Sequence, residues 1–203
     1  NTLRFSILFT VFFLSLGNLS SQDSVEEQAR QLLEDHKGAL VVVTAKGMLE
    51  AKTSGDALPA REQQRRTLGV TIGDDGLVVV SNSAIDASLG LEGQQAKMDD
   101  DVVTIQTAKT VFSEVEISYG DSTLLSGKVV RQDVEADVAF IMPDQAEATA
   151  LNKTFQKVDL AQFAATADAA DRVVGLSRSS AVYGYMPTLV LGRLTGVFRG
   201  GRT

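Results

Sequence analysis

The sequence predicts a mainly β protein, because short valine-rich runs alternate with turn residues along much of the chain. The clearest unit is a pair of apolar runs, Leu68–Ile72 and Leu77–Ser81, separated by Gly73-Asp-Asp-Gly76. An Asp-Gly pair between two apolar runs is a strong local signal for a tight hairpin. The second run contains three consecutive valines, Val78–Val80, without polar alternation. We therefore expect a hairpin whose second strand is covered on both faces.

Composition limits the classes of protein to consider. The chain has 203 residues, 44% hydrophobic and 22% charged, which suits one globular domain or two small ones. A net charge of −7 argues against nucleic-acid binding, which needs clustered Lys and Arg. The chain has no Cys, which excludes disulfides, thiol nucleophiles and Cys-ligated zinc.

The N-terminal segment predicts export. Arg4 precedes the apolar run Phe5–Leu16, and small polar residues follow it. This order is typical of the helix of a secretory signal peptide, here residues 1–21, and predicts a periplasmic or secreted protein. A buried core helix and an uncleaved membrane anchor are the alternatives. The chain has neither an initiator Met nor an obvious closing element near Thr203, so we expect a fragment open at both ends.

The elements before the hairpin are a helix and a strand. Ser24–His36 reads as a helix with Ser24 as its cap, Glu27 completing a capping box, and one apolar face. Ala39–Ala45 contains three valines and reads as a strand. Residues 46–66 are polar and charged, so we expect a long loop.

After the hairpin the chain continues with turns and strands. Three adjacent Asp follow Met98, but the calcium-loop pattern is missing, so a solvated turn is favoured over a divalent cation site. Val102–Thr107 and Val111–Tyr119 are expected to pair as a hairpin, and Leu124–Arg131 is the next strand.

Two stretches resemble trypsin-like serine peptidases of the HtrA (DegP) type. The first is Gly-x-x-Ile-x-x-Asp-Gly-x-Val-Val in 69–79, followed by Ser81 and Asn82. In that family this strand ends in Thr-Asn-Asn-His, and the His is the catalytic base. In a gapless alignment Ser83 takes the position of this histidine.

The second stretch is Asp133-x-x-x-Asp137, followed by alternating apolar residues and preceded by Lys128-Val-Val130. In the family the second Asp of this pattern is the triad acid, and the resemblance therefore implies that Asp137 occupies that position. The alternative is an Asp that only caps the start of a strand.

The resemblance implies a trypsin-like double β-barrel. Residues 22–147 would hold a leading helix and the complete first barrel, and 148–203 a linker and the start of a truncated second barrel. Its opening strands would be Asp171–Leu176 and Met186–Val197, although the Asn-Pro that the family has nearby is absent after Gly175.

The triad chemistry is incomplete in this sequence. A triad needs a serine nucleophile, an imidazole that accepts and returns its proton, and a carboxylate that orients the ring. Ser83 cannot act as a base at neutral pH. His36, the single histidine, ends the first helix and is expected to face solvent. The family's Gly-x-Ser-Gly-Gly motif does not occur in the 203 residues. We expect the Ser83 hydroxyl or nearby N–H groups to hydrogen-bond Asp137, because a buried carboxylate needs donors.

These observations favour an exported peptidase-fold domain without catalysis that binds peptides or acts as a scaffold. The expected partners are unfolded or extended polypeptides, with a possible homo-oligomer, no nucleic acid, and membrane contact only through an uncleaved signal segment. No cofactor or metal is expected. The alternatives are an active serine endopeptidase of protein quality control, whose nucleophile and peptide-binding PDZ domains would lie beyond Thr203, and an unrelated all-β binding module.

Overall fold

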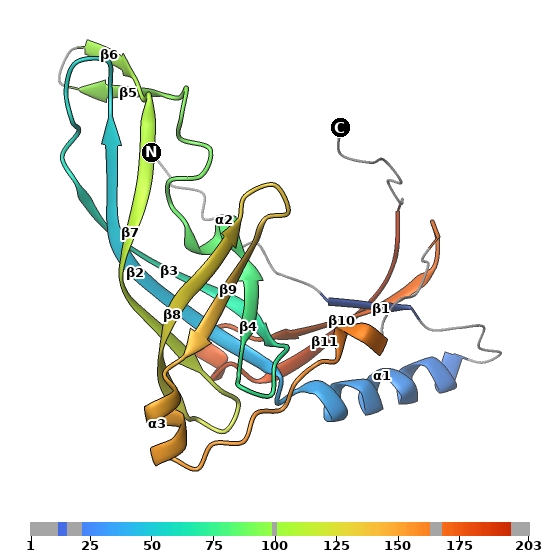
Figure 1. Ribbon diagram of the computed structural model, residues 1–203. Helices are drawn as coiled ribbons and strands as arrows, with labels where there is room; N and C mark the ends of the chain where they lie inside the picture. The colour runs from blue at the N-terminus through green and yellow to red at the C-terminus, as the bar shows by residue number, and fades with distance from the viewer. Residues whose placement is uncertain (1–11, 16–21, 99–100, 163–167, 196–203) are drawn as a thin grey trace.

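The computed structural model describes residues 12–15, 22–98, 101–162 and 168–195, and it is mainly β as predicted (Figure 1). The strands are β1 (Phe12–Ser15), β2 (Leu40–Lys52), β3 (Arg61–Thr71), β4 (Val78–Ser81), β5 (Gln95–Met98), β6 (Asp101–Thr104), β7 (Thr107–Ser118), β8 (Leu124–Asp133), β9 (Val138–Pro143), β10 (Arg172–Arg178) and β11 (Pro187–Arg193). The α-helices are α1 (Gln22–His36), α2 (Asn82–Ile85) and α3 (Gln145–Ala150), and the 3₁₀ turns are η1 (Leu160–Gln162) and η2 (Ala181–Tyr183).

Six strands close into a barrel in the order β2-β3-β4-β9-β8-β7. The ring closes because β2 pairs on one side with β3, from Leu40 opposite Val70, and on the other side with β7, from Val42 opposite Ser118. The strands β2, β3 and β4 follow one another, and β7 returns by a long connection to lie beside β2. This is the Greek key arrangement of antiparallel strands.

The predicted hairpin forms the centre of the barrel wall. β3 and β4 pair antiparallel from Gly69 opposite Val80, and Gly76 in the turn has a φ of 83°, which glycine adopts without strain. Val78 and Val80 are buried in the barrel, while Val79 is half-buried against a second apolar core. The valine run is therefore covered on both faces, as predicted.

Alternate residues of the strands fill the barrel interior. Buried valine, isoleucine, leucine and alanine side chains from β2, β4, β7, β8 and β9 form one core, together with Ile85 of α2 and Ala148 of α3. Because side chains alternate between the two faces of a strand, each strand contributes every second residue to this core. Side chains fill the interior of the barrel, so binding or catalytic residues can lie only at its ends or on its outer surface.

A second, smaller core joins the barrel to the rest of the chain. Its buried members come from α1, the start of β2, β3, the segment after α3, and β10: Ala29, Ala39, Leu40, Val70, Val158, Val174 and Leu176. β10 pairs antiparallel with both β1 and β11 in a three-stranded sheet. The two predicted opening strands of the second barrel correspond to β10 and β11. The described residues form an open sheet here, and a second barrel stays a prediction.

Residues 46–66 are not a long loop, and this prediction was wrong. β2 continues to Lys52 and β3 begins at Arg61, so only the connection between them is irregular. Together with β7 they form an arm that extends beyond the barrel towards β5 and β6 (Figure 1). The polar sequence fits a strand here because both faces of the arm carry charged groups, with ion pairs such as Lys46–Glu114 at 2.7 Å.

The hairpin expected between 102–107 and 111–119 does not form. β6 pairs with β5, while β7 pairs with β2 and β8. Strand pairing depends on partners distant in sequence, which the local alternation of apolar residues does not specify.

The N-terminal prediction is corrected at four residues. Phe12–Ser15, inside the predicted signal segment, form β1 opposite Leu176 to Val173 of β10, so they are not helical. Residues 1–11 and 16–21 lie outside the described residues. α1 begins at Gln22, which places Ser24 inside the helix and not at its cap. None of the helices in the described ranges is both long and apolar enough to span a bilayer.

Arg178 of β10 ties the three-stranded sheet to the barrel. Its side chain is 8% exposed, and Nε, Nη2 and Nη1 donate to the carbonyl oxygens of Leu40, Lys37 and Tyr185, each at 2.9 Å. Burial lowers the pKa of Arg178, while the negative charge of Asp121 acts in the opposite direction. A guanidinium remains protonated in proteins, so a buried cation is held here by backbone carbonyls.

We expect Arg178→Met to destabilise the protein by about 2–4 kcal/mol, because one buried and two partly buried carbonyl groups lose a charged donor while the new side chain fills similar space. Urea denaturation of the two proteins measures this difference. Arg131→Met, at an exposed position of β8, is the matched control and should change the free energy of unfolding by less than about 0.5 kcal/mol. Equal stability of the two variants would contradict the role given to Arg178.

Candidate functional site

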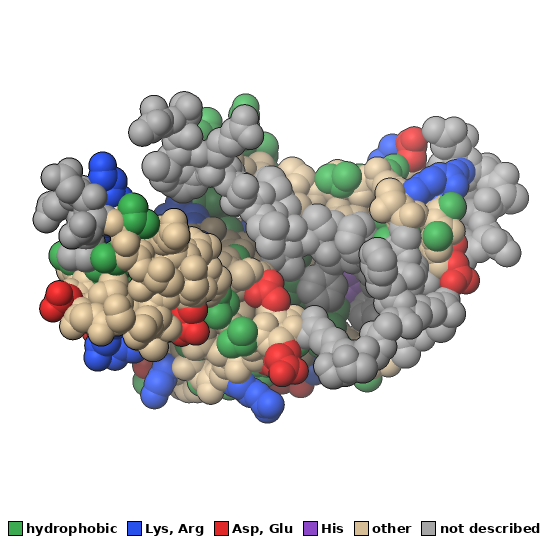
Figure 2. Space-filling model, turned by 90° about the horizontal axis from the view of Figure 1, so that it is seen from above, with side chains coloured by type: hydrophobic (Ala, Val, Ile, Leu, Met, Phe, Trp, Pro, Cys, Tyr) green, Lys and Arg blue, Asp and Glu red, His purple; other side chains and the backbone are tan. Residues whose placement is uncertain are grey.

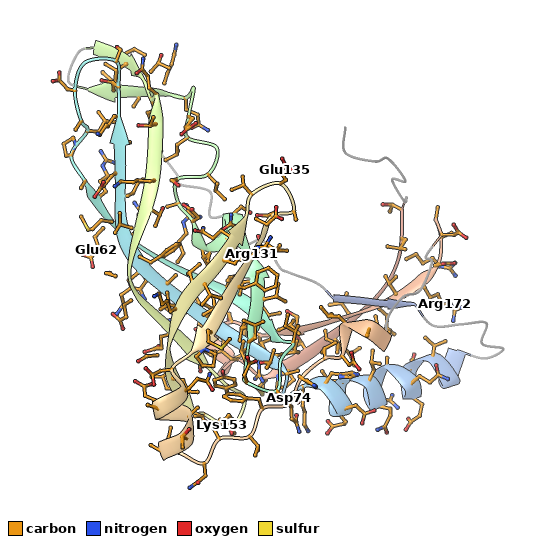
Figure 3. The ribbon with its side chains drawn as sticks, in the orientation of Figure 1. Glu62, Asp74, Arg131, Glu135, Lys153 and Arg172 are labelled. Carbon is orange, nitrogen blue, oxygen red and sulfur yellow. The ribbon has the colours of Figure 1, made fainter. Side chains whose placement is uncertain are left out.

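The candidate site lies where β4 ends and α2 begins. β4 pairs with β9, and this pairing sets Ser81 opposite Val138. Asp137 directly precedes Val138, so it arrives beside the first turn of α2, and its backbone carbonyl accepts a hydrogen bond from the Asn82 N–H at 3.1 Å. In Figure 3, Glu135 marks the loop between β8 and β9 that carries Asp137 towards α2.

The loop backbone holds Asp137 in an unusual conformation. The φ of Asp137 is 54°, in the left-handed region that Asn and Asp tolerate better than most residues. The Asp133 carboxylate accepts from the Ala136 N–H at 2.8 Å, which closes the turn from the other side. Asp133 therefore shapes the turn, and Asp137 points its carboxylate across to α2.

The Asp137 carboxylate accepts hydrogen bonds from two serines. The Ser83 N–H donates to Oδ1 at 2.7 Å, and the hydroxyls of Ser81 and Ser83 donate to Oδ2 at 2.8 Å and 3.0 Å. The predicted contact between Ser83 and Asp137 is thus confirmed, both through the hydroxyl and through the backbone. Asp137 caps the N-terminal end of α2 from a different strand, since Ser81 itself makes no side-chain cap bond to this helix.

These hydrogen bonds favour the ionised carboxylate. Partial burial is the largest influence and raises the pKa of Asp137, but the combined hydrogen bonds from Ser83 and Ser81 lower it more. The pKa therefore lies below its ordinary value, and Asp137 is a weak base at neutral pH.

A second polar network, which was not predicted from the sequence, lies beside the first. Asn82 is fully buried, and its Oδ1 accepts from Gln132 Nε2 at 2.7 Å. The same Gln132 nitrogen donates to Asp86 at 3.1 Å, and Asp86 also accepts from the Ser88 N–H and hydroxyl at 2.9 Å and 2.6 Å. The available signal was the Asp86-x-Ser88 spacing, which is typical of a turn closed by an Asp side chain. This network fixes the orientation of α2 against β8.

His36 does not supply the missing base in this arrangement. It is the last residue of α1, ahead of β2, and its backbone carbonyl accepts from the Ala39 N–H at 2.9 Å. The side chain is half-buried and not solvent-facing as predicted. Ser83, which the resemblance aligns with the family's histidine, donates its hydroxyl to Asp137 Oδ2 at 3.0 Å.

Further predictions from the sequence concern metal ions and nucleic acids. In the described ranges, His, Cys, Asp and Glu side chains form no group of three that could hold a metal ion. Asp99 and Asp100 of the acidic triplet lie outside these ranges, so that expectation stays a prediction. On the face seen in Figure 2, acidic and basic side chains are interspersed, so this face has no single-sign field that would attract a polyanion.

Comparison with models of known protein families finds no match, and comparison with curated proteins finds no similar sequence.

We predict that Asp137→Asn lowers the stability at neutral pH by about 1 kcal/mol, the usual cost of losing a helix cap. The folded-state pKa of Asp137 is below its unfolded value, so its contribution is fully present above the unfolded pKa of about 3.9. It is lost as the pH falls through the folded-state pKa. Urea unfolding of both proteins from pH 7 downwards should therefore give a difference that shrinks in acid. A difference that is constant with pH would rule out the ionised cap.

Proposed function

We propose that this chain is an exported peptidase-fold domain of the HtrA type that has lost catalysis and binds extended polypeptide segments. The observation that carries the proposal is the contact between Ser83 and Asp137, with a hydroxyl at the position where the family has its imidazole. In this proposal β10 and β11 are the first strands of the second barrel. The leader-like composition of Arg4 and Phe5–Leu16 supports export.

The chemistry of the serine cluster argues against turnover. Ser81 and Ser83 both direct their hydroxyl protons to one carboxylate oxygen. A carboxylate with a lowered pKa is a poor acceptor for the proton of an attacking hydroxyl, so neither serine is activated as a nucleophile. Nucleophilic catalysis by this cluster would therefore be slow.

A free strand edge supports polypeptide binding. β11 pairs with β10 along one side, and the described residues provide no strand for its other side. Val190 and Leu191 of β11 are 59% and 45% exposed, which is high for apolar residues of a strand. An extended segment can add to such an edge through backbone hydrogen bonds and place its side chains against the exposed apolar residues.

A second candidate function is an all-β binding module unrelated to peptidases. The contacts of Asp137 favour it, because a cap of α2 explains this carboxylate completely without any catalytic ancestry. Both candidates predict binding without turnover. They differ in whether an imidazole introduced beside Asp137 would pair with its carboxylate.

Purified protein should not hydrolyse fluorescein-labelled casein above the buffer rate, yet it should bind carboxymethylated α-lactalbumin, which stays unfolded, in a fluorescence anisotropy titration. Val190→Lys should weaken binding about tenfold, equivalent to about 1.4 kcal/mol, because a charge blocks strand addition at the edge.

Val102→Lys is the control for this titration, since Val102 is 65% exposed on β6 in the arm. It should bind the unfolded protein like the parent. Casein turnover that a serine-directed inhibitor abolishes would contradict the loss of catalysis. Equal binding by the two lysine variants would contradict the β11 edge as the binding site.

The Ser83→His substitution separates the two candidates. In a site derived from a peptidase, the introduced imidazole should donate to Asp137, and the neighbouring carboxylate should raise its pKa above the ordinary value of about 6.5. NMR titration of the imidazole protons measures this pKa. A ring that titrates at its ordinary value in a destabilised protein would favour the unrelated module.

A further inference from the structure

A groove lies between α1 and the outer face of the β10–β11 hairpin, away from Asp137. Its volume is about 360 Å³, within the range of roughly 300–1,000 Å³ that is usual for small-molecule sites. Val25 of α1, Val174 of β10 and Leu191 of β11 provide apolar lining. Val25 and Val174 are 5% and 0% exposed, so these two side chains are a fixed part of the core.

Two arginines face each other across the hairpin at the groove. Arg172 of β10 and Arg193 of β11 are directly opposite in the register, and both line the groove. Like charges at directly opposite strand positions are destabilising. Figure 3 shows Arg172 at the outer end of the sheet, near the first turns of α1.

The two guanidinium groups have little compensation from the protein. Within the described ranges, neither arginine forms an ion pair with a carboxylate. Arg193 Nη1 donates to the carbonyl oxygen of Ala170 at 3.2 Å, which uses one of its five N–H donors. A local pattern that costs stability without a visible structural gain is typical of a functional site.

The charges at the groove favour an anionic ligand. Glu26 also lines the groove, but its carboxylate lies 3.6 Å from Arg30 on the same helix, so its charge is shared with that residue. Arg172 and Arg193 therefore leave positive charge at the groove, which suits an anion. The groove also borders the first turns of α1, where the helix dipole is positive.

We propose that this groove binds a carboxylate attached to a short apolar group. The carboxylate would bind between Arg172 and Arg193, which match its two oxygens with planar pairs of donors. The apolar part would lie against Val25, Val174 and Leu191, because Val174 and Leu191 share the strand face of the two arginines. Such a ligand could be a short aliphatic acid or the C-terminus of a peptide with an apolar last residue, and both present the same chemistry. The groove shares Leu191 with the β11 edge that the proposed function uses, but carboxylate binding and binding of an unfolded protein are measured separately, so either proposal can fail without the other.

An NMR titration of the ¹⁵N-labelled chain with octanoate tests the site. Saturable shifts of the amides of Val25, Val174 and Leu191 are expected, and octanamide, which lacks the charge, should bind at least about tenfold more weakly. An acetylated Ala-Ala-Val-Leu peptide is titrated with a free and with an amidated C-terminus. Binding of the free-acid peptide alone identifies a chain end as the ligand, and binding of octanoate alone identifies an aliphatic acid. Either result, or both, supports the carboxylate site.

Variants assign the binding to the arginine pair. Arg172→Gln and Arg193→Gln should each weaken carboxylate binding about tenfold, whereas Arg131→Gln, at an exposed position of β8, should bind like the parent. Arg172→Gln should melt at the same temperature as the parent or higher, since it removes a repulsion between opposite strand positions. This readout separates lost binding from lost folding. The proposal is overturned if neither octanoate nor the free-acid peptide binds saturably, or if acid and amide bind equally. It is also overturned if a variant with both Arg172→Gln and Arg193→Gln binds the carboxylates like the parent.

Discussion

The double pairing of β2 closes the barrel, and the rest of the structure depends on this closure. One strand of 13 residues is bound on one edge to β3 and on the other to β7, so the six-stranded sheet has no open edge within the ring. Closure places β9 beside β4, because β8 and β9 are the two strands that complete the ring between β7 and β4. Only with β9 in that position does the loop after β8 reach the start of α2.

The contact between Asp137 and the two serines is a direct product of this geometry. A carboxylate from one loop satisfies the exposed N–H of a helix that follows a different strand, and two hydroxyls complete its hydrogen bonding. Each of these bonds stabilises the ionised carboxylate, and together they also weaken it as a base. The arrangement that secures α2 therefore also leaves Asp137 ionised and a weak base. Under the proposed function, this contact links the fold to binding without turnover.

The arginines of β10 and β11 show two different uses of the same side chain. Arg178 is buried, and each part of its guanidinium donates to a backbone carbonyl, which joins the small sheet to the entrance of β2. Arg172 and Arg193 lie at the other end of the same hairpin, exposed and opposite each other beside an apolar groove. The architecture alone explains Arg178. The repulsion between Arg172 and Arg193 is compensated when an anion binds between them, as proposed above.

Local sequence patterns determined the hairpin of β3 and β4 and the apolar face of α1, whereas the contact of Ser83 with Asp137, 54 residues apart, was predicted from the resemblance of two stretches to a family. The hairpin and the helix face depend on a turn and a helical period within a short stretch, and such signals act before distant parts of the chain meet. The tertiary structure alone decided that residues 46–52 and 61–66 are strand, that β6 pairs with β5, and that Phe12–Ser15 lie beside β10. It also decided that Arg172 faces Arg193. A strand is stabilised by the partner with which it exchanges hydrogen bonds, and the identity of a partner many residues away is not encoded in either strand's own alternation of residues.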